Sequence, residues 1–154
     1  MTASCERRSI LLVDDDGRLL RSVKRLLARD YDVEACEGGA AALAVLAAGR
    51  RFDAILCDLD MPGVTGMDVH RRVAEQLPGL ERTIIFMTGG AFTPEATRFV
   101  RECNNASIEK PVDLVELARR VREIHDASRA RPGRLAAGTP PEPFPGPAGV
   151  LRGD

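Results

Sequence analysis

Features that would indicate a nucleic-acid-binding, metal-finger or membrane protein are missing from this sequence. The 22 basic and 23 acidic side chains nearly cancel, giving a formal net charge of -1, so the chain lacks the basic excess typical of proteins that bind nucleic acid. Its four cysteines are widely separated and form no CxxC pair, which favours reduced structural thiols over a zinc site or a disulfide framework. No stretch is apolar enough for a signal peptide or a membrane span. We therefore expect a cytoplasmic protein that neither binds nucleic acid directly nor inserts into a membrane.

The composition is that of an ordinary globular domain. Of the 154 residues, 44% are hydrophobic and 29% are charged, which is enough apolar material for one domain with its own core. We expect residues 1–8 to be an N-terminal extension and residues 9–127 to form the domain. Residues 128–154 are rich in proline and glycine and poor in aliphatic side chains, so burial there cannot offset the entropy of ordering, and a mobile tail is predicted.

Short apolar runs alternate with helical patterns along the predicted domain. Continuous apolar runs are typical of parallel strands covered on both faces, and apolar residues spaced three and four apart indicate helices that pack by one side. This alternation predicts a doubly wound α/β fold with a five-stranded parallel sheet, although the local pattern does not indicate the strand order. Strands are predicted at 9–13, 31–36, 52–58, 83–87 and 106–109, and helices at 18–29, 39–49, 67–77, from Pro94 and from Asp113.

Polar and charged side chains stand at or just past the carboxyl ends of four predicted strands. They are Asp14, Asp15, Asp58, Asp60, Thr88 and Lys110. Since these strand ends share one edge of a parallel sheet, we expect the side chains to meet there. Neighbouring carboxylates repel unless they share a hard cation, and oxygen ligands suit Mg²⁺. With such a cation, a carboxylate can attack phosphorus while Lys110 and Thr88 hold the phosphoryl oxygens, so the pattern predicts an aspartyl phosphate.

In these motifs and their spacing, the sequence resembles the response regulator receiver domain from residue 10 to about residue 126. The family pattern is an acid pair after the first strand, an acceptor Asp after the third, Thr or Ser after the fourth and Lys-Pro after the fifth. The resemblance implies a flavodoxin-like sheet of order 2-1-3-4-5, phosphorylation of Asp58 and a cis Lys110-Pro111 bond. It also implies that Asp15, Asp58 and the backbone carbonyl of Asp60 coordinate Mg²⁺, with Asp14 helping through water.

The resemblance also implies partners for the chain. The phosphoryl donor is expected to be a phosphohistidine of a sensor histidine kinase or a histidine phosphotransfer protein. The fourth helix, fifth strand and fifth helix are expected to present a face to a downstream protein, and a homodimer is left open. Such a chain is a signalling phosphoacceptor rather than an enzyme, because it catalyses only its own phosphorylation and dephosphorylation. We expect a stand-alone receiver, or one similar to the terminal receiver of a hybrid kinase.

Two alternative functions use the same residues. Asp58-Leu59-Asp60 also matches the nucleophile and general acid of haloacid-dehalogenase-type phosphatases. In that family, however, the DxD motif follows the first strand, whereas here an acid pair precedes it. The second alternative is a pseudo-receiver that binds partners without being phosphorylated, and the retention of every chemical residue argues against it.

The sequence departs from the receiver pattern at Ser107, where most members carry Tyr or Phe three residues before the lysine. A hydrogen bond from Thr88 to the phosphoryl group is not strong enough to switch the conformation alone. We therefore predict that Lys110 and rearrangement of the Gly89-Gly90 loop, with Phe92 repacking, supply the remaining free energy. Two histidines, His70 and His125, lie on predicted helices without a partner motif. Both are predicted to be residues of the helix surface.

Overall fold

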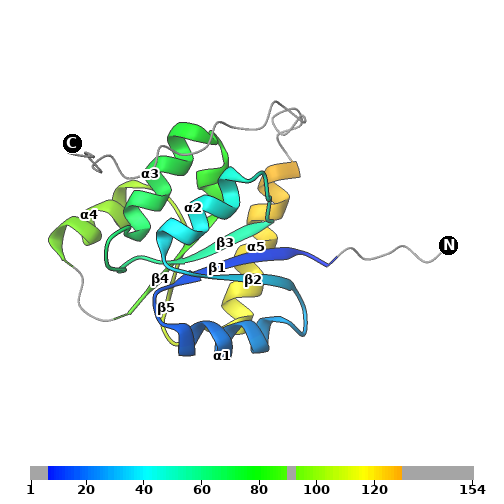
Figure 1. The fold of residues 1–154 in the computed structure, drawn as a ribbon. Coiled ribbons are helices and arrows are strands. Elements are labelled where there is room, and N and C mark those ends of the chain that lie inside the picture. Colours follow the sequence, from blue (N-terminus) through cyan, green and yellow to red (C-terminus); the bar gives the residue numbers. More distant parts are fainter. Residues whose placement is uncertain (1–6, 90–92, 130–154) are drawn as a thin grey trace, which may run out of the picture.

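A parallel five-stranded sheet with helices on both faces forms the fold (Figure 1). The structure is a computed structural model and describes residues 7–89 and 93–129. Its strands are β1 (Ser9–Asp14), β2 (Asp32–Glu37), β3 (Ala54–Asp58), β4 (Ile84–Thr88) and β5 (Ser107–Glu109). Its helices are α1 (Gly17–Leu27), α2 (Gly39–Ala47), α3 (Gly66–Gln76), the short 3₁₀ helix η1 (Leu80–Thr83), α4 (Pro94–Glu102) and α5 (Leu114–Arg129).

The strand order is β2-β1-β3-β4-β5, and every pair is parallel. This confirms the flavodoxin-like topology that the resemblance implied. β1 lies between β2 and β3, so the order reverses there, and ligands of such sheets bind outside the carboxyl ends at this reversal. β1 ends at Asp14, β3 at Asp58 and β4 at Thr88. The sheet thus brings three of the predicted site residues to one edge.

Two hydrophobic layers flank the sheet because its central strands are apolar on both faces. Alternate residues of β3 point to opposite sides: Ile55 and Cys57 pack with residues of α2, α3 and α4, while Ala54 and Leu56 pack with residues of α1 and α5. All five residues of β3 are buried. The continuous apolar runs of the sequence therefore correspond to strands covered on both faces, as predicted.

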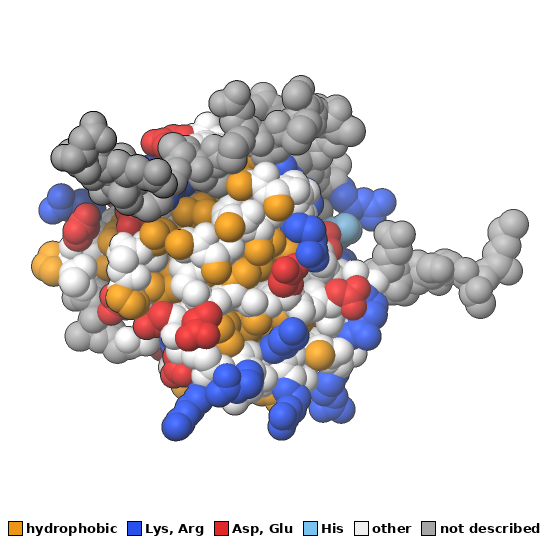
Figure 2. All heavy atoms as spheres, viewed as in Figure 1, with side chains coloured by type: hydrophobic (Ala, Val, Ile, Leu, Met, Phe, Trp, Pro, Cys, Tyr) orange, Lys and Arg blue, Asp and Glu red, His pale blue; other side chains and the backbone are white. Residues whose placement is uncertain are grey.

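The outer surface of α1 carries a row of cations. Arg18, Arg21, Lys24 and Arg25 are exposed, and Lys and Arg side chains gather along the lower edge of the molecule, where α1 lies (Figure 2). Leu20, Val23 and Leu27 form its buried stripe. Asp16 caps the helix, since its side chain accepts hydrogen bonds from the backbone N–H groups of Arg18 and Leu19. The sequence predicted an amphipathic helix here, at residues 18–29.

Most boundaries of the predicted elements shift by one or two residues in the structure. Thr83 ends η1 rather than starting β4, because Gly79 takes a left-handed conformation and the Glu81 carboxylate accepts its N–H at 2.6 Å, which starts a helical turn. β3 starts at Ala54, two residues later than predicted. The predicted mobile tail lies almost wholly outside the described residues, as do most of the N-terminal extension, Gly90 and Phe92. Among the helices within residues 7–89 and 93–129, none is long and apolar enough to cross a membrane.

Candidate functional site

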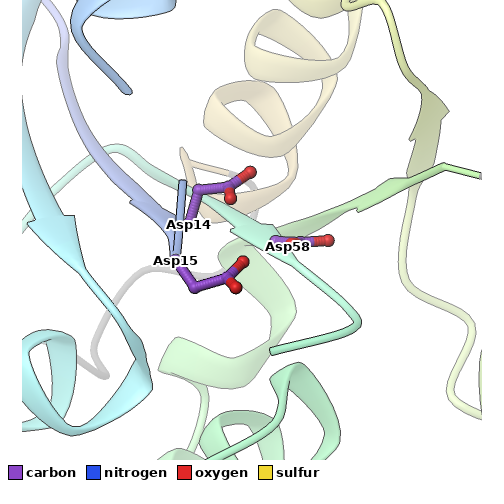
Figure 3. A group of neighbouring side chains, drawn as sticks. All are labelled: Asp14, Asp15 and Asp58. Carbon is purple, nitrogen blue, oxygen red and sulfur yellow. The ribbon is translucent and has the colours of Figure 1, made fainter. Parts of the chain in front are cut away.

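Three carboxylates meet at the carboxyl edge of the sheet. Asp14 ends β1, Asp15 follows it and Asp58 ends β3, and one oxygen from each lies within 4.8 Å of the other two. Figure 3 shows the three side chains gathered at this edge. Asp14 is 1% exposed and Asp58 is 6% exposed, whereas Asp15 is open to solvent. Buried like charges this close require a positive partner.

Lys110 supplies that partner from the end of β5. Its Nζ lies 2.8 Å from Asp14 Oδ2 and 3.3 Å from Asp58 Oδ2. The strand order makes this possible, because β5 is two strands from β3 and the long lysine side chain covers the gap. A Cβ at Gly89 would stand 3.2 Å from Lys110 Cδ, so the glycine leaves room for the lysine side chain. The Lys110-Pro111 peptide bond is cis, as expected.

The two buried carboxylates differ in the lengths of their polar contacts. Asp14 Oδ1 accepts the Asp16 N–H at 2.9 Å and its Oδ2 accepts from Lys110 at 2.8 Å, so both oxygens have hydrogen bonds of ordinary length. Asp58 Oδ1 accepts the Asp60 N–H at 3.3 Å, and its Oδ2 has Lys110 at 3.3 Å. Asp58 is therefore the less firmly bound of the two and the better placed to form a new bond.

The loop after β3 packs against the Asp58 backbone. A Cβ at Gly66 would stand 2.6 Å from the Asp58 carbonyl oxygen and 2.8 Å from Leu59 Cα, so only glycine allows this approach. Thr65 and Asp68 form a capping box at the start of α3 and fix the chain there. The side chain of Asp60 is exposed. What Asp60 brings to the site is its backbone, through the N–H bonded to Asp58.

Thr88 completes the edge from the end of β4. It is 6% exposed, and its hydroxyl donates to the Ile108 carbonyl oxygen at 3.5 Å. That distance is long for an O–H···O hydrogen bond, so the hydroxyl can exchange this partner for a stronger acceptor at little cost. Its backbone is firmly placed, since the Thr88 carbonyl accepts the Lys110 N–H at 2.7 Å.

The electrostatics of the site penalise the charge on Asp58. Burial and the neighbouring Asp14 charge raise the pKa of Asp58 from 3.8 to about 6, although the Lys110 charge and the Asp60 N–H oppose them. Burial by itself lowers the pKa of Lys110, but the hydrogen bond to Asp14 and the charges of Asp58 and Asp14 outweigh it, so that this pKa is raised. A carboxylate with a pKa raised by burial and charge is typical of functional sites.

This pKa predicts that Asp58 destabilises the fold at neutral pH when no divalent cation is added. Because the pKa is higher in the folded chain than in the unfolded chain, the contribution of Asp58 to stability is full below pH 3.8 and is lost as the pH rises through about 6. Asp58→Asn should therefore increase the free energy of unfolding by about 2 kcal/mol at pH 7.5 and have little effect at pH 4. Urea denaturation at the two pH values measures the difference.

A matched control is Asp126→Asn, because Asp126 is exposed on α5. That replacement should change the free energy of unfolding by less than about 0.5 kcal/mol at both pH values. An Asp58→Asn effect of equal size at pH 4 and pH 7.5 would contradict the electrostatic origin of the stabilisation.

The site has the chemistry of a divalent-cation site. The three carboxylates offer only oxygen ligands, which hard cations prefer. When they are ionised they carry three negative charges, of which Lys110 balances one, so two remain for a divalent cation. The exposed Asp15 leaves one side of the cluster open for the cation and its waters. These residues therefore fit the magnesium ion that the sequence suggested.

Comparison with known proteins identifies the family. The family model described as the response regulator receiver domain matches residues 10–122. The chain belongs to this family. It is 34% identical over 125 residues to the sensor histidine kinase AruS of Pseudomonas aeruginosa, covering 79% of this chain and 12% of that protein. It is 32% identical over 105 residues to the transcriptional regulatory protein GlrR of Escherichia coli, covering 68% of this chain and 23% of that protein.

A solved structure has the same fold. A response regulator receiver domain protein from Clostridium thermocellum aligns with a TM-score of 0.71 at 23% identity, covering 80% of this chain and 98% of that one. The receiver domain spans less than a quarter of the length of the two curated relatives named above. It is a signalling module that occurs in both sensor kinases and transcriptional regulators.

The receiver's structure assembles the predicted site residues with one qualification and one correction. Asp14, Asp15, Asp58 and Lys110 meet as expected, whereas the exposed Asp60 side chain is not one of the three clustered carboxylates.

The prediction that His70 is a surface residue is wrong. Its ring is half-buried between α3 and α4, and its Nε2 lies 3.2 Å from Asn105 Oδ1. His125 is also half-buried, on α5. Asn105, which sequence reasoning missed, follows α4 and Asn104, whose φ is 60°.

Proposed function

We propose that this receiver accepts a phosphoryl group on Asp58 from a phosphohistidine of a sensor histidine kinase or a histidine phosphotransfer protein. The observation that supports this most directly is the difference between the two buried carboxylates. Asp14 has two hydrogen bonds of 2.9 and 2.8 Å, whereas Asp58 has only contacts of 3.3 Å and a pKa raised to about 6. The nucleophile is thus the carboxylate with the most to gain from forming a bond.

The transfer itself needs few protein groups. An Asp58 oxygen forms the new O–P bond while the P–N bond of the phosphohistidine breaks, and the electron pair of that bond returns to the imidazole nitrogen. Lys110 is positioned to turn from Asp58 Oδ2 to an oxygen of the incoming group, and the Thr88 hydroxyl can leave the Ile108 carbonyl for another. Both contacts strengthen as negative charge accumulates at the phosphoryl group.

The acidic cluster supports a proposed set of ligands for the cation. Asp14, Asp15 and Asp58 would hold Mg²⁺, together with the backbone carbonyl of Asp60. When bound, the cation supplies positive charge where the carboxylate and the phosphoryl group approach one another. The net charge of the ionised side chains, two negative after Lys110 is counted, supports a requirement for a divalent rather than a monovalent cation.

Phosphorylation is proposed to change a face of the receiver that binds a downstream protein. β5 directly precedes Lys110, and α4 follows Thr88 by a short connection. Both groups that would hold the phosphoryl oxygens thus lie beside elements of the face formed by α4, β5 and α5. The first turn of α5 exposes Leu114 (40%) and Val115 (81%). Apolar side chains at this exposure are suited to a protein partner.

The direct test is the mass of the intact chain after incubation with acetyl phosphate and Mg²⁺. We expect one added phosphoryl group per chain, which hydroxylamine removes because it cleaves acyl phosphates. The same incubation with a chelator should leave the mass unchanged. Binding of a partner without any phosphoryl transfer, even from a histidine phosphotransfer protein, would instead favour the pseudo-receiver alternative.

A further inference from the structure

Of the α-helices within the described residues, α4 has the fewest buried residues. Among residues 94–102 only Ala96 is buried, while Phe99 and Val100 are half-buried. By comparison, the other helices of the same layer, α2 and α3, bury four and three residues. With so small a buried surface, the position of α4 depends on a few contacts that can be named.

One group of rings joins α4 to its neighbours, and we call it the three-ring cluster: His70 of α3, Phe86 of β4 and Phe99 of α4. The centroids of Phe99 and His70 lie 5.2 Å apart at 83°, those of Phe99 and Phe86 lie 5.5 Å apart at 80°, and those of His70 and Phe86 lie 6.0 Å apart at 42°. The two pairs that include Phe99 are edge-to-face, a favourable arrangement for aromatic rings. Phe99 lies in the second half of α4, and α4 lies beside α3 (Figure 1).

Asn105 fixes the cluster from the other side. Its Nδ2 donates to the carbonyl oxygens of Glu81 at 2.7 Å and Ile84 at 2.8 Å. These two acceptors settle the orientation of the amide, so Oδ1 must face His70 and accept its Nε2–H. Asn105 also follows the C-terminal end of α4 closely in the chain. The ring and the amide therefore hold that end of the helix to α3 and to the start of β4.

The opposite end of α4 is joined to the phosphorylation site. Thr88 ends β4, and five residues connect it to Pro94 at the start of the helix. Ser107, where most receivers carry an aromatic ring, offers no large side chain to transmit a movement of Thr88 through β5. The aromatic residue of β4 is Phe86, which lies two residues before Thr88 and on the same face of the strand.

We infer that the three-ring cluster and Asn105 act as a pivot for α4, so that movement of Thr88 towards a phosphoryl group displaces the N-terminal end of the helix while the C-terminal end stays in place. This inference rests on the proposed phosphorylation of Asp58. A nine-residue helix is about 13 Å long, so a small rotation about Phe99 reorients the exposed side chains of its first turns. His70 and Phe99 are then positioning residues for the output face and have no part in phosphoryl transfer.

The test is an amide NMR comparison of the full chain with and without beryllofluoride and Mg²⁺, which mimic the phosphoryl group. In the wild type, shift changes at residues 95–97 should exceed those at residues 101–103 by about threefold or more. Phe99→Leu and His70→Gln should reduce this ratio to near one. Amides of Asp60 and Lys110 should respond alike in all variants, because the site itself is intact.

Two matched controls leave the cluster in place. Arg98→Ala alters the exposed neighbour of Phe99, and Ser107→Ala alters the half-buried residue at the aromatic position. Both should keep the wild-type ratio. A ratio that survives both cluster variants, or a wild-type ratio near one while Asp60 and Lys110 respond, overturns the pivot alone. Absence of any response at Asp60 and Lys110 in the wild type overturns the proposed phosphorylation as well.

An independent readout reports the cluster itself. Nitrogen-15 shifts of the His70 ring should show the proton on Nε2, and Asn105→Ala should remove this preference. A ring that carries its proton on Nδ1 in the wild type would contradict the hydrogen bond from His70 Nε2 to Asn105 Oδ1.

Discussion

Asp58→Asn should abolish phosphorylation of the chain by acetyl phosphate. An amide oxygen is neutral and a poor nucleophile, and the variant also loses one of the three negative charges that would hold Mg²⁺. The fold should persist, because the amide keeps the shape of the side chain and no longer carries charge at a buried position. Intact mass spectrometry after incubation with acetyl phosphate and Mg²⁺ measures the loss.

The control for this experiment is Asp60→Asn. Asp60 has an exposed side chain and reaches the site through its backbone, so this variant should still be phosphorylated. In a haloacid-dehalogenase-type phosphatase the second acid of the DxD motif is the general acid, and its removal would suppress turnover. Phosphorylation that persists in Asp58→Asn, or fails in Asp60→Asn with an intact fold, would contradict the assignment of Asp58 as the acceptor in a receiver.

The strands show how much of a sheet can be predicted from local sequence. Residues 10–13 and 55–57 are apolar throughout because helices cover both faces of the sheet there, and this signal is contained in the runs themselves. The order of the strands in the sheet cannot be predicted in this way. β1 pairs with both β2 and β3, which depends on the direction that each crossover takes, and no residue within a strand encodes that direction. Only the resemblance to receivers implied it.

The site was predictable where it depends on strand ends and unpredictable where it depends on distances. Acids at the ends of β1 and β3 had to meet once the strands were parallel and adjacent. That Lys110 would contact Asp14 more closely than Asp58, at 2.8 Å against 3.3 Å, depends on how β5 packs at the sheet edge. His70 was misjudged for the same reason: within α3 it follows the buried Val69 and looks peripheral, but α4 and Asn105 cover it from more than twenty residues away.

The electrostatic repulsion within the carboxylate cluster underlies both its cost to stability and its proposed binding of a cation. Burying Asp58 beside Asp14 raises its pKa and lowers stability at neutral pH, and a divalent cation bound by the carboxylates would relieve that cost. The energy that the fold loses here would then favour cation binding, because a ligand that binds only the folded arrangement gains from every repulsion that it removes. Lys110 is the one cation among the described side chains that contacts these carboxylates, so its removal tests this view most severely.

Lys110→Met should destabilise the fold by about 2 kcal/mol at pH 8 without added cation. Breaking a buried pair costs about 3–5 kcal/mol, but Lys110 is 24% exposed and Asp58 can relieve part of the repulsion by taking up a proton. The raised pKa of Lys110 means that its stabilising contribution is full throughout the neutral range and is lost only as the pH rises beyond its ordinary value of 10.5. Below about pH 6 Asp58 is protonated, so the destabilisation should be smaller at pH 5 than at pH 8.

The control is the other lysine of the chain. Lys24 is exposed on α1, so Lys24→Met should change the free energy of unfolding by less than about 0.5 kcal/mol at both pH values. A double-mutant cycle separates charge from packing: in the Asp58→Asn background, Lys110→Met should cost less than in the wild type, because only the Asp14 charge remains for Lys110 to balance. Equal costs in the two backgrounds at both pH values would mean that Lys110 stabilises the fold through Asp14 or its aliphatic stem and not through the Asp58 charge, and the electrostatic account of Asp58 would be wrong.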